Sequence, residues 1–235
     1  MLLSIIIPAY NEEKRIGPTL VQINSFLKNR SYNCEILVID DGSADNTMKK
    51  AEKSSLFTEN KSRVISNGTN GGKGFSVKNG ILNSHGEYVL ISDADLSTPI
   101  EEVDKLFKYI DKGFDIAIGS RSVSTSEIKA HQPWHRERMG RIFNFFVRKI
   151  LVSDFNDTQC GFKLFKGNIA RAIAAQLKID GFSFDVEMLY IAKQKGYKIA
   201  EVGVMWNNSA QSTVRVFGSS LNMLLDLLKI KSLHR

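Results

Sequence analysis

Runs of apolar residues alternate with amphipathic segments along the first half of the chain. The apolar runs are candidate buried strands and cover residues 1–8, 35–39, 64–65, 88–92 and 115–119. Apolar residues at helical spacing lie between them, in residues 16–27, 45–51, 75–82 and 99–110. Because strands separated by helices favour parallel pairing through crossover connections, we predict an α/β fold with a mainly parallel sheet flanked by helices.

Beyond Arg121 the pattern changes. Residues 122–132 are polar without an apolar period, which predicts a mobile loop. Residues 142–152 and a last segment, 221–235, place phenylalanine or leucine at helical spacing beside lysine and arginine, a pattern typical of basic amphipathic helices. Such helices either pack on their own domain or lie on an anionic membrane, and the pattern alone leaves both interpretations open.

Composition narrows the classes of protein. A chain of 235 residues with 43% hydrophobic content can bury the core of one ordinary α/β domain. The formal net charge of +7 favours an anionic partner. We do not expect nucleic acid, because the basic residues cluster beside apolar helices without an interleaved aromatic platform on a strand.

The first eight residues indicate a buried strand rather than a leader, since no basic segment precedes the apolar run. No apolar run approaches the roughly 20 residues that cross a bilayer. We therefore expect a cytoplasmic chain whose membrane contact is peripheral.

Two predicted strands end in acidic clusters, Asp40-Asp41-Gly42 and Asp93-Ala94-Asp95. Ligands of parallel sheets bind outside the carboxyl ends of the strands, so these carboxylates are expected to face a ligand. Asp93 and Asp95 are two residues apart and share one side of an extended segment, where two oxygens can converge on a hard cation. The pattern indicates a divalent metal beside a phosphorylated molecule.

A glycine-rich loop, residues 67–74, precedes the helix at 75–82. It fits neither the Walker pattern nor the dinucleotide fingerprint, but Lys73 at the start of a helix is suited to an anion. A second interpretation of Asp93 and Asp95 is an Asp-dependent phosphohydrolase, with the first as phosphoryl acceptor and the second as acid and base. These residues alone do not decide between the two.

Five ordered motifs resemble those of GT-A fold, family-two inverting glycosyltransferases: residues 6–13, 38–43, 70–74, 93–95 and 119–121. Residues 157–165 and 184–190 resemble the dolichyl-phosphate β-glucosyltransferase branch more than the mannosyl branch. The resemblance covers essentially the whole chain. It implies a single GT-A domain over 1–235, with a nucleotide-sugar part at about 1–121 and an acceptor- and membrane-facing part at about 122–235.

The resemblance also implies the reaction. Glucose would pass from UDP-glucose, with inversion, to a polyprenyl phosphate of the dolichyl or undecaprenyl kind, in an enzyme that uses Mg²⁺ or Mn²⁺ at the cytoplasmic face of a membrane. A polyprenyl-phosphate mannosyltransferase using GDP-mannose is the alternative within the class, because sugar selectivity depends on a few hydrogen bonds that motifs do not specify.

Site residues are carried over from the same motifs. The donor-binding positions are Pro8, Ala9, Tyr10, Glu12, Asp40, Gly42, Lys73, Asp93, Ala94 and Asp95. Among them, Asp93 and Asp95 are the expected metal ligands, Tyr10 would stack on the base, and Asp40 would accept the imide N–H of uracil.

The catalytic positions implied by the resemblance are Asp95, Arg121 and Asp157. The acceptor phosphate would be bound by Arg136, Arg138, Arg141 and Gln159, since guanidinium groups match phosphate oxygens. A phosphate acceptor with a second pKa near about 6 is already anionic, so Asp157 is expected to orient groups more than to act as a base. Asp185 and Glu187 would lie on the acceptor side or cap a helix.

Overall fold

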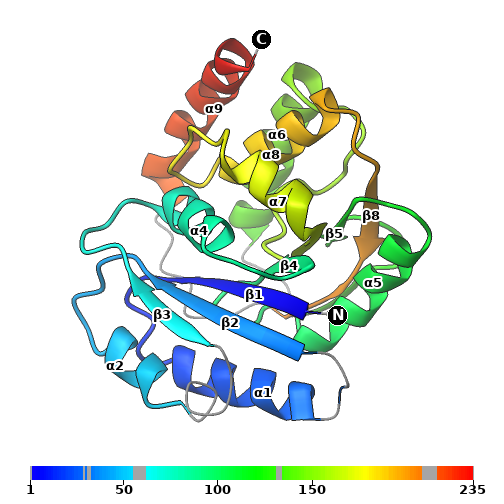
Figure 1. Cartoon of the computed structure of the whole chain (residues 1–235). Coiled ribbons are helices and arrows are strands. Elements are labelled where there is room, and N and C mark those ends of the chain that lie inside the picture. Colours follow the sequence, from blue (N-terminus) through cyan, green and yellow to red (C-terminus); the bar gives the residue numbers. More distant parts are fainter. Residues whose placement is uncertain are drawn as a thin grey trace.

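A central sheet lies between two layers of helices in the computed structural model, which describes residues 2–28, 30, 33–54, 62–130, 134–207 and 216–234 (Figure 1). The strand order is β3-β2-β1-β4-β7-β5-β8. The strands are β1 (Leu2–Ala9), β2 (Asn33–Asp40), β3 (Arg63–Ser66), β4 (Tyr88–Ile91), β5 (Ile116–Ser120), β7 (Lys163–Lys166) and β8 (Ile199–Gly203). Only β7 runs antiparallel to its neighbours in this sheet, so the predicted mainly parallel α/β fold is confirmed.

Both faces of the sheet are buried, which explains why its strands are continuous apolar runs. Along β1, Ile5 and Ile7 pack into one core cluster and Ile6 into the other. The first face is covered by α1 (Ile16–Lys28), α2 (Thr47–Glu52), the 3₁₀ turn η1 (Ile100–Glu102) and α5 (Val103–Asp111). The second face is covered by α4 (Lys73–Leu82), α6 (Trp134–Ile150), α7 (Gly167–Ala174), α8 (Phe184–Gln194) and α9 (Val216–Leu233).

The mobile loop predicted at residues 122–132 is wrong for part of its length. Glu127–Ala130 forms β6, which pairs in parallel with β9 (Met205–Asn207) in a separate two-stranded sheet. Residues 127–129 are exposed, so the segment shows no apolar period, and its partner strand begins 78 residues later, at Met205. Local sequence therefore carried little sign of this strand.

The two amphipathic helices, α6 and α9, lie against each other and share the core. Phe143 and Val147 of α6 and Leu227 and Ile230 of α9 are buried in one cluster. The exposed large apolar side chains of the two helices are Ile142, Phe145, Phe146, Leu225, Leu228 and Leu233. Each helix thus buries one apolar stripe and exposes another, and within the described ranges no helix has the length and apolar character needed to cross a bilayer.

Candidate active site

The carboxyl ends of β1, β2, β4 and β5 meet at one edge of the sheet and carry the predicted site residues. Tyr10 follows β1, Asp40 ends β2, Asp93 follows β4 and Arg121 follows β5. Because β1 pairs in parallel with both β2 and β4, the acidic clusters at 40–41 and 93–95 lie on the same side of the sheet. The acidic motifs therefore meet at the carboxyl ends of the strands, as the sequence predicted.

Asp40 and Tyr10 provide two groups suited to a nucleoside. The Asp40 side chain is buried; its Oδ2 accepts a hydrogen bond from the Ser43 N–H at 3.2 Å, while its Oδ1 accepts none from the described residues. A buried acceptor without a donor costs free energy that a ligand N–H would offset. Tyr10 is 43% exposed, which leaves its ring accessible to a planar base.

The turn after β1 is fixed against the segment that follows β2. The Asn11 N–H donates to Ser43 Oγ at 2.9 Å, and the Glu12 N–H donates to Thr47 Oγ1 at 2.7 Å. Gly42 has a φ of 73°, and a Cβ at this position would lie 2.7 Å from the backbone of residue 69. Glycine is therefore required where the two turns approach the glycine-rich loop.

Asp41 shapes the glycine-rich loop. Its carboxylate accepts the N–H groups of Gly71 and Gly72 at 3.0 and 2.9 Å, which fixes the backbone that leads into α4. Lys73, the first residue of α4, places its Nζ 2.6 Å from Asp93 Oδ1. The predicted anion-binding lysine thus forms an ion pair with the first aspartate of the acidic motif.

The charges around Asp93 keep it ionised. Burial opposes ionisation, but Lys73, together with Lys163 and Arg121, outweighs burial and lowers the pKa of Asp93. Burial opposes the protonated form of Lys73 as well, and Asp93 outweighs that effect, so the pKa of Lys73 is raised. The pair is an ammonium and a carboxylate at neutral pH.

Asp95 lies in a tight turn beside two further charges. Its Oδ1 accepts the Ser97 N–H at 3.0 Å, and its Oδ2 lies 3.8 Å from Nη1 of Arg15. Arg15 also forms a bidentate ion pair with Glu12. Burial raises the pKa of Glu12, and the nearby charges of Asp95 and Asp93 add to that effect. Glu12, Asp93 and Asp95 therefore meet here with two cations, Arg15 and Lys73. Among the described residues, no three or more acidic, histidine or cysteine side chains are arranged as a metal site.

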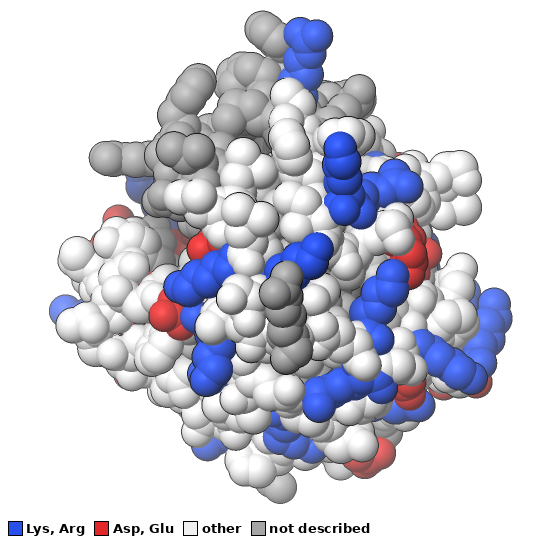
Figure 2. All heavy atoms as spheres, turned by 90° about the horizontal axis from the view of Figure 1, so that it is seen from above, with Lys and Arg blue, Asp and Glu red and all other residues white. Residues whose placement is uncertain are grey.

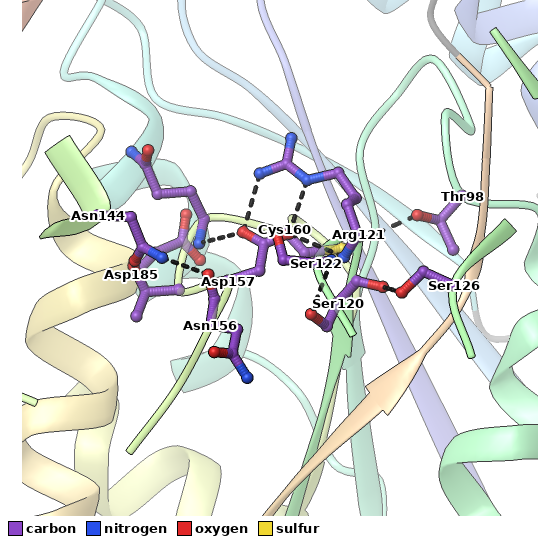
Figure 3. Close-up of polar contacts among 12 residues, drawn as sticks. Thr98, Ser120, Arg121, Ser122, Ser126, Asn144, Asn156, Asp157, Cys160 and Asp185 are labelled. Atoms are coloured by element: carbon purple, nitrogen blue, oxygen red, sulfur yellow. Dashed lines mark hydrogen bonds and ion pairs between the residues drawn. The ribbon is translucent and has the colours of Figure 1, made fainter. Parts of the chain in front are cut away.

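Arg121 and Asp157 form the most completely bonded ion pair of the site (Figure 3). Asp157 is 5% exposed and accepts Arg121 Nε at 2.7 Å, Nη2 at 2.9 Å and the Arg121 backbone N–H at 3.0 Å. Burial opposes its charge, but Arg121 outweighs burial and lowers the pKa of Asp157. A carboxylate in this state orients the guanidinium and is poorly suited to remove a proton.

The segment after Asp157 packs directly on the acidic motif. A Cβ added at Gly161 would lie 2.2 Å from Asp93 Oδ2. Two positions further, Lys163 is fully buried and pairs with Asp185 of α8, while it also donates to the Cys160 carbonyl. Asp93, Asp157 and Asp185 therefore each form an ion pair close to the carboxyl ends of the strands.

Gly161→Ala is expected to lower turnover by about 10- to 100-fold, because its methyl group displaces the Asp93 carboxylate from Lys73 and small misplacements of site groups have effects of this size. Steady-state kinetics with each purified variant gives the turnover rate. Gly181→Ala is the matched control, since a Cβ there meets nothing within 4 Å. Equal activity of the two variants would contradict the close packing on Asp93.

The remaining predicted residues are placed as follows. The Gln159 N–H donates to Asp157 Oδ1 at 3.1 Å, which brings Gln159 to the same site. Arg138 is exposed on α6, whereas the side chains of Arg136 and Arg141 lie outside the described residues. Pro8 and Ala9 are the last residues of β1, and Ala94 is buried with its carbonyl bonded to the Thr19 hydroxyl.

The helix-capping interpretation of Asp185 and Glu187 is wrong, because neither side chain caps α8. Asp185 pairs with Lys163, and the fully buried Glu187 accepts the Lys178 and Ile179 N–H groups and contacts His234, the residue that follows α9. Lys163 itself is not among the site residues predicted from the motifs. A single lysine inside the apolar run 162–165 was the available signal, since a buried charge needs a partner.

Comparison with known proteins identifies relatives of the whole chain. The family model described as "Glycosyl transferase family 2" matches residues 4–173. A human protein named dolichyl-phosphate beta-glucosyltransferase is 37% identical over 97% of this chain and 74% of its own length. A Dictyostelium discoideum protein of the same name is 38% identical over 97% of this chain and 73% of its own length.

Solved structures with the same fold are more distant in sequence. Glucosyl-3-phosphoglycerate synthase from Mycobacterium tuberculosis, in complex with Mn²⁺, UDP and glucosyl-3-phosphoglycerate, has a TM-score of 0.70 and 19% identity. That likeness covers 99% of this chain and 80% of the synthase. It supports the GT-A arrangement of the sheet, and together with the family match and the relatives it leads to one conclusion: the chain belongs to glycosyl transferase family 2.

Proposed function

We propose that this protein transfers glucose from UDP-glucose to a polyprenyl phosphate with inversion, which gives a β-linked lipid-phosphate sugar. The observation that carries the proposal is the 33–38% identity, over nearly the whole chain, to relatives named dolichyl-phosphate beta-glucosyltransferase. The geometry agrees with it, because the exposed Tyr10 ring, a buried Asp40 oxygen that accepts no hydrogen bond from the described residues, and the Asp93 and Asp95 carboxylates all lie at the carboxyl ends of neighbouring strands.

The donor would lie across this edge with uracil between Tyr10 and Asp40. Asp93 and Asp95 would hold Mg²⁺ or Mn²⁺ with two carboxylates. The described residues offer no group of three or more acidic, histidine or cysteine ligands, so the remaining oxygens would come from the diphosphate and water, as is common for Mg²⁺. Such a cation offsets the charge of a departing diphosphate. Lys73 adds a fixed positive charge and keeps Asp93 ionised.

Arg121 would stabilise the leaving group. Asp157 holds its guanidinium through two side-chain hydrogen bonds, and 28% of the Arg121 side chain remains exposed to a ligand. A preorganised cation stabilises charge that develops in the transition state at little reorganisation cost. The acceptor phosphate is already an anion and attacks without a base, which agrees with the low pKa of Asp157.

The lipid acceptor would approach from the side of α6 and α9. Their exposed apolar residues and flanking lysines and arginines suit the surface of an anionic bilayer at its cytoplasmic face. Figure 2 shows Lys and Arg side chains predominating over Asp and Glu on the face seen from above, the side on which α9 and α6 lie in Figure 1. These two features support a peripheral membrane contact.

Arg138→Ala is expected to raise the KM for the lipid phosphate about 10-fold and to leave the KM for UDP-glucose unchanged, because a charge-assisted bond to phosphate contributes about 1.5–3 kcal/mol. Initial rates at varied acceptor and at varied donor separate the two constants. Arg30→Ala, which removes an arginine paired with Asp104 on the opposite helical layer, serves as the control. An unchanged acceptor KM would remove Arg138 from the phosphate site.

A radiolabelled transfer assay tests the proposed reaction. UDP-glucose, GDP-mannose and UDP-N-acetylglucosamine are offered separately with Mg²⁺ or Mn²⁺ and dolichyl or undecaprenyl phosphate, and the organic phase is counted. Label that moves into lipid from UDP-glucose alone supports the proposal. Label from GDP-mannose alone identifies a mannosyltransferase, and release of inorganic phosphate from a monoester without lipid product identifies a phosphohydrolase.

A further inference from the structure

Glu201 of β8 holds the segment that carries Asp157. Its Oε1 accepts the Asp157 N–H at 2.8 Å and the Ser120 hydroxyl at 2.8 Å. Both Glu201 oxygens lie 3.0 Å from the Asn156 N–H, and Oε2 also accepts Asn156 Nδ2 at 3.1 Å. The Glu201 carboxylate thus bonds to Ser120, the residue before Arg121, and to Asn156 and Asp157. Asp157 is the ion-pair partner of Arg121.

Helix α6 is bonded to the other side of the same segment. Asn144 Nδ2 donates to the Asn156 carbonyl, and the Thr158 hydroxyl lies 3.4 Å from Asn144 Oδ1. One turn later, Arg148 donates to the Ser153 carbonyl at 3.3 Å. Residues 153–158 are therefore attached to α6 by side chains of that helix and to the central sheet by Glu201. Figure 3 shows Asn144, Asn156, Asp157 and Arg121 lying next to one another.

We propose that Glu201 and Asn144 are positioning residues that connect helix α6 to the Arg121 guanidinium through residues 156 and 157. Neither touches the reacting atoms. Each fixes the backbone of the segment that carries Asp157, and Asp157 in turn accepts two hydrogen bonds from the Arg121 guanidinium and one from the Arg121 backbone N–H. This inference rests on the proposed function, in which Arg121 meets the leaving group and α6 carries acceptor-binding arginines.

These contacts predict that changes at Asn144 or Glu201 lower kcat and leave the KM for UDP-glucose nearly unchanged. Asn144 and Glu201 bond to residues 120 and 156–158, whereas the nucleoside groups Tyr10 and Asp40 are fixed by the separate turns at 10–12 and 40–47. A shift of the 153–158 segment therefore moves Arg121 and leaves those turns in place. Misplacement of a preorganised charge by about 1 Å has effects of up to about 10²-fold in rate.

Two variants test the connection. Asn144→Ala removes the two contacts of Asn144 with residues 156 and 158, and Glu201→Gln keeps the shape but puts an amide donor against the Asn156 donors. Each is expected to lower kcat about 10-fold or more, with the KM for UDP-glucose within about twofold of the wild-type value. Asn83→Ala and Glu101→Gln, exposed changes away from this segment, are the matched controls.

A double-mutant cycle separates this inference from the proposed function. Arg121→Lys and Asn144→Ala are measured alone and together in the transfer assay, with thermal unfolding as a check on folding. If the two residues act through one guanidinium, the combined loss in kcat is smaller than the product of the single losses. Full multiplicativity, or a UDP-glucose KM that rises with unchanged kcat, overturns the connection. An Arg121→Lys variant with wild-type kcat overturns the role of Arg121 itself.

Discussion

Asp95→Ala is expected to lower glucose transfer by about 10³-fold or more while the protein stays folded. The carboxylate lies near those of Glu12 and Asp93, and a cation bound there would offset the charge of the leaving diphosphate. Loss of about 4 kcal/mol of transition-state stabilisation corresponds to about 10³-fold in rate. The expected loss of stability is small, because Asp95 is half-buried, accepts a hydrogen bond from the Ser97 N–H and lies 3.8 Å from Nη1 of Arg15.

The measurement is a single-turnover transfer assay at saturating Mg²⁺ or Mn²⁺, accompanied by thermal unfolding of the same sample. Asp111→Ala removes an exposed aspartate at the end of α5 and is expected to retain wild-type activity. Asp95→Ala with activity within about tenfold of wild type under strict metal control would refute the assignment of Asp95 as a ligand.

The edge of the sheet was predictable because its signals are local. These strands are apolar runs, β2 and β4 lead into acidic clusters, and parallel pairing with β1 brings those ends together without further information. Asp40 and Asp93 follow this rule directly. Motif order then supplied the family, which the relatives and the family model bear out.

The interior of the site was less predictable because it depends on contacts between distant segments. Strand β7 inserts between β4 and β5, and its Lys163 is buried only because Asp185, 22 residues later, reaches it from α8. Glu201 likewise acts on residues more than 40 positions earlier. A lone charge in an apolar run indicates that a partner exists, but the sequence does not indicate which residue it is.

Lys163→Met is expected to destabilise the protein by about 3–5 kcal/mol, because it leaves the buried Asp185 without its cation. The side chain of Lys163 is fully buried, so solvent does not replace the lost contact. Urea unfolding at pH 7 gives the free energy of unfolding. Lys166→Met is the control from the same strand: its pair with Asp115 is 36% exposed on the lysine side, and its loss is expected to cost at most about 1 kcal/mol.

The penalty for Lys163→Met is also expected to shrink as the pH falls. Burial raises the pKa of Asp185 and Lys163 opposes that rise, so removal of Lys163 raises the folded-state pKa further. A carboxyl whose folded pKa lies above its unfolded pKa of about 3.9 destabilises the fold fully above the folded pKa and not at all below the unfolded one. The difference in the free energy of unfolding between Lys163→Met and wild type should therefore be largest at pH 7 and smallest at about pH 4.

Asp185→Asn, added to Lys163→Met, should recover part of the lost stability at pH 7. A penalty that is independent of pH and unchanged by Asp185→Asn would show that packing, and not the unpaired carboxylate, accounts for the loss.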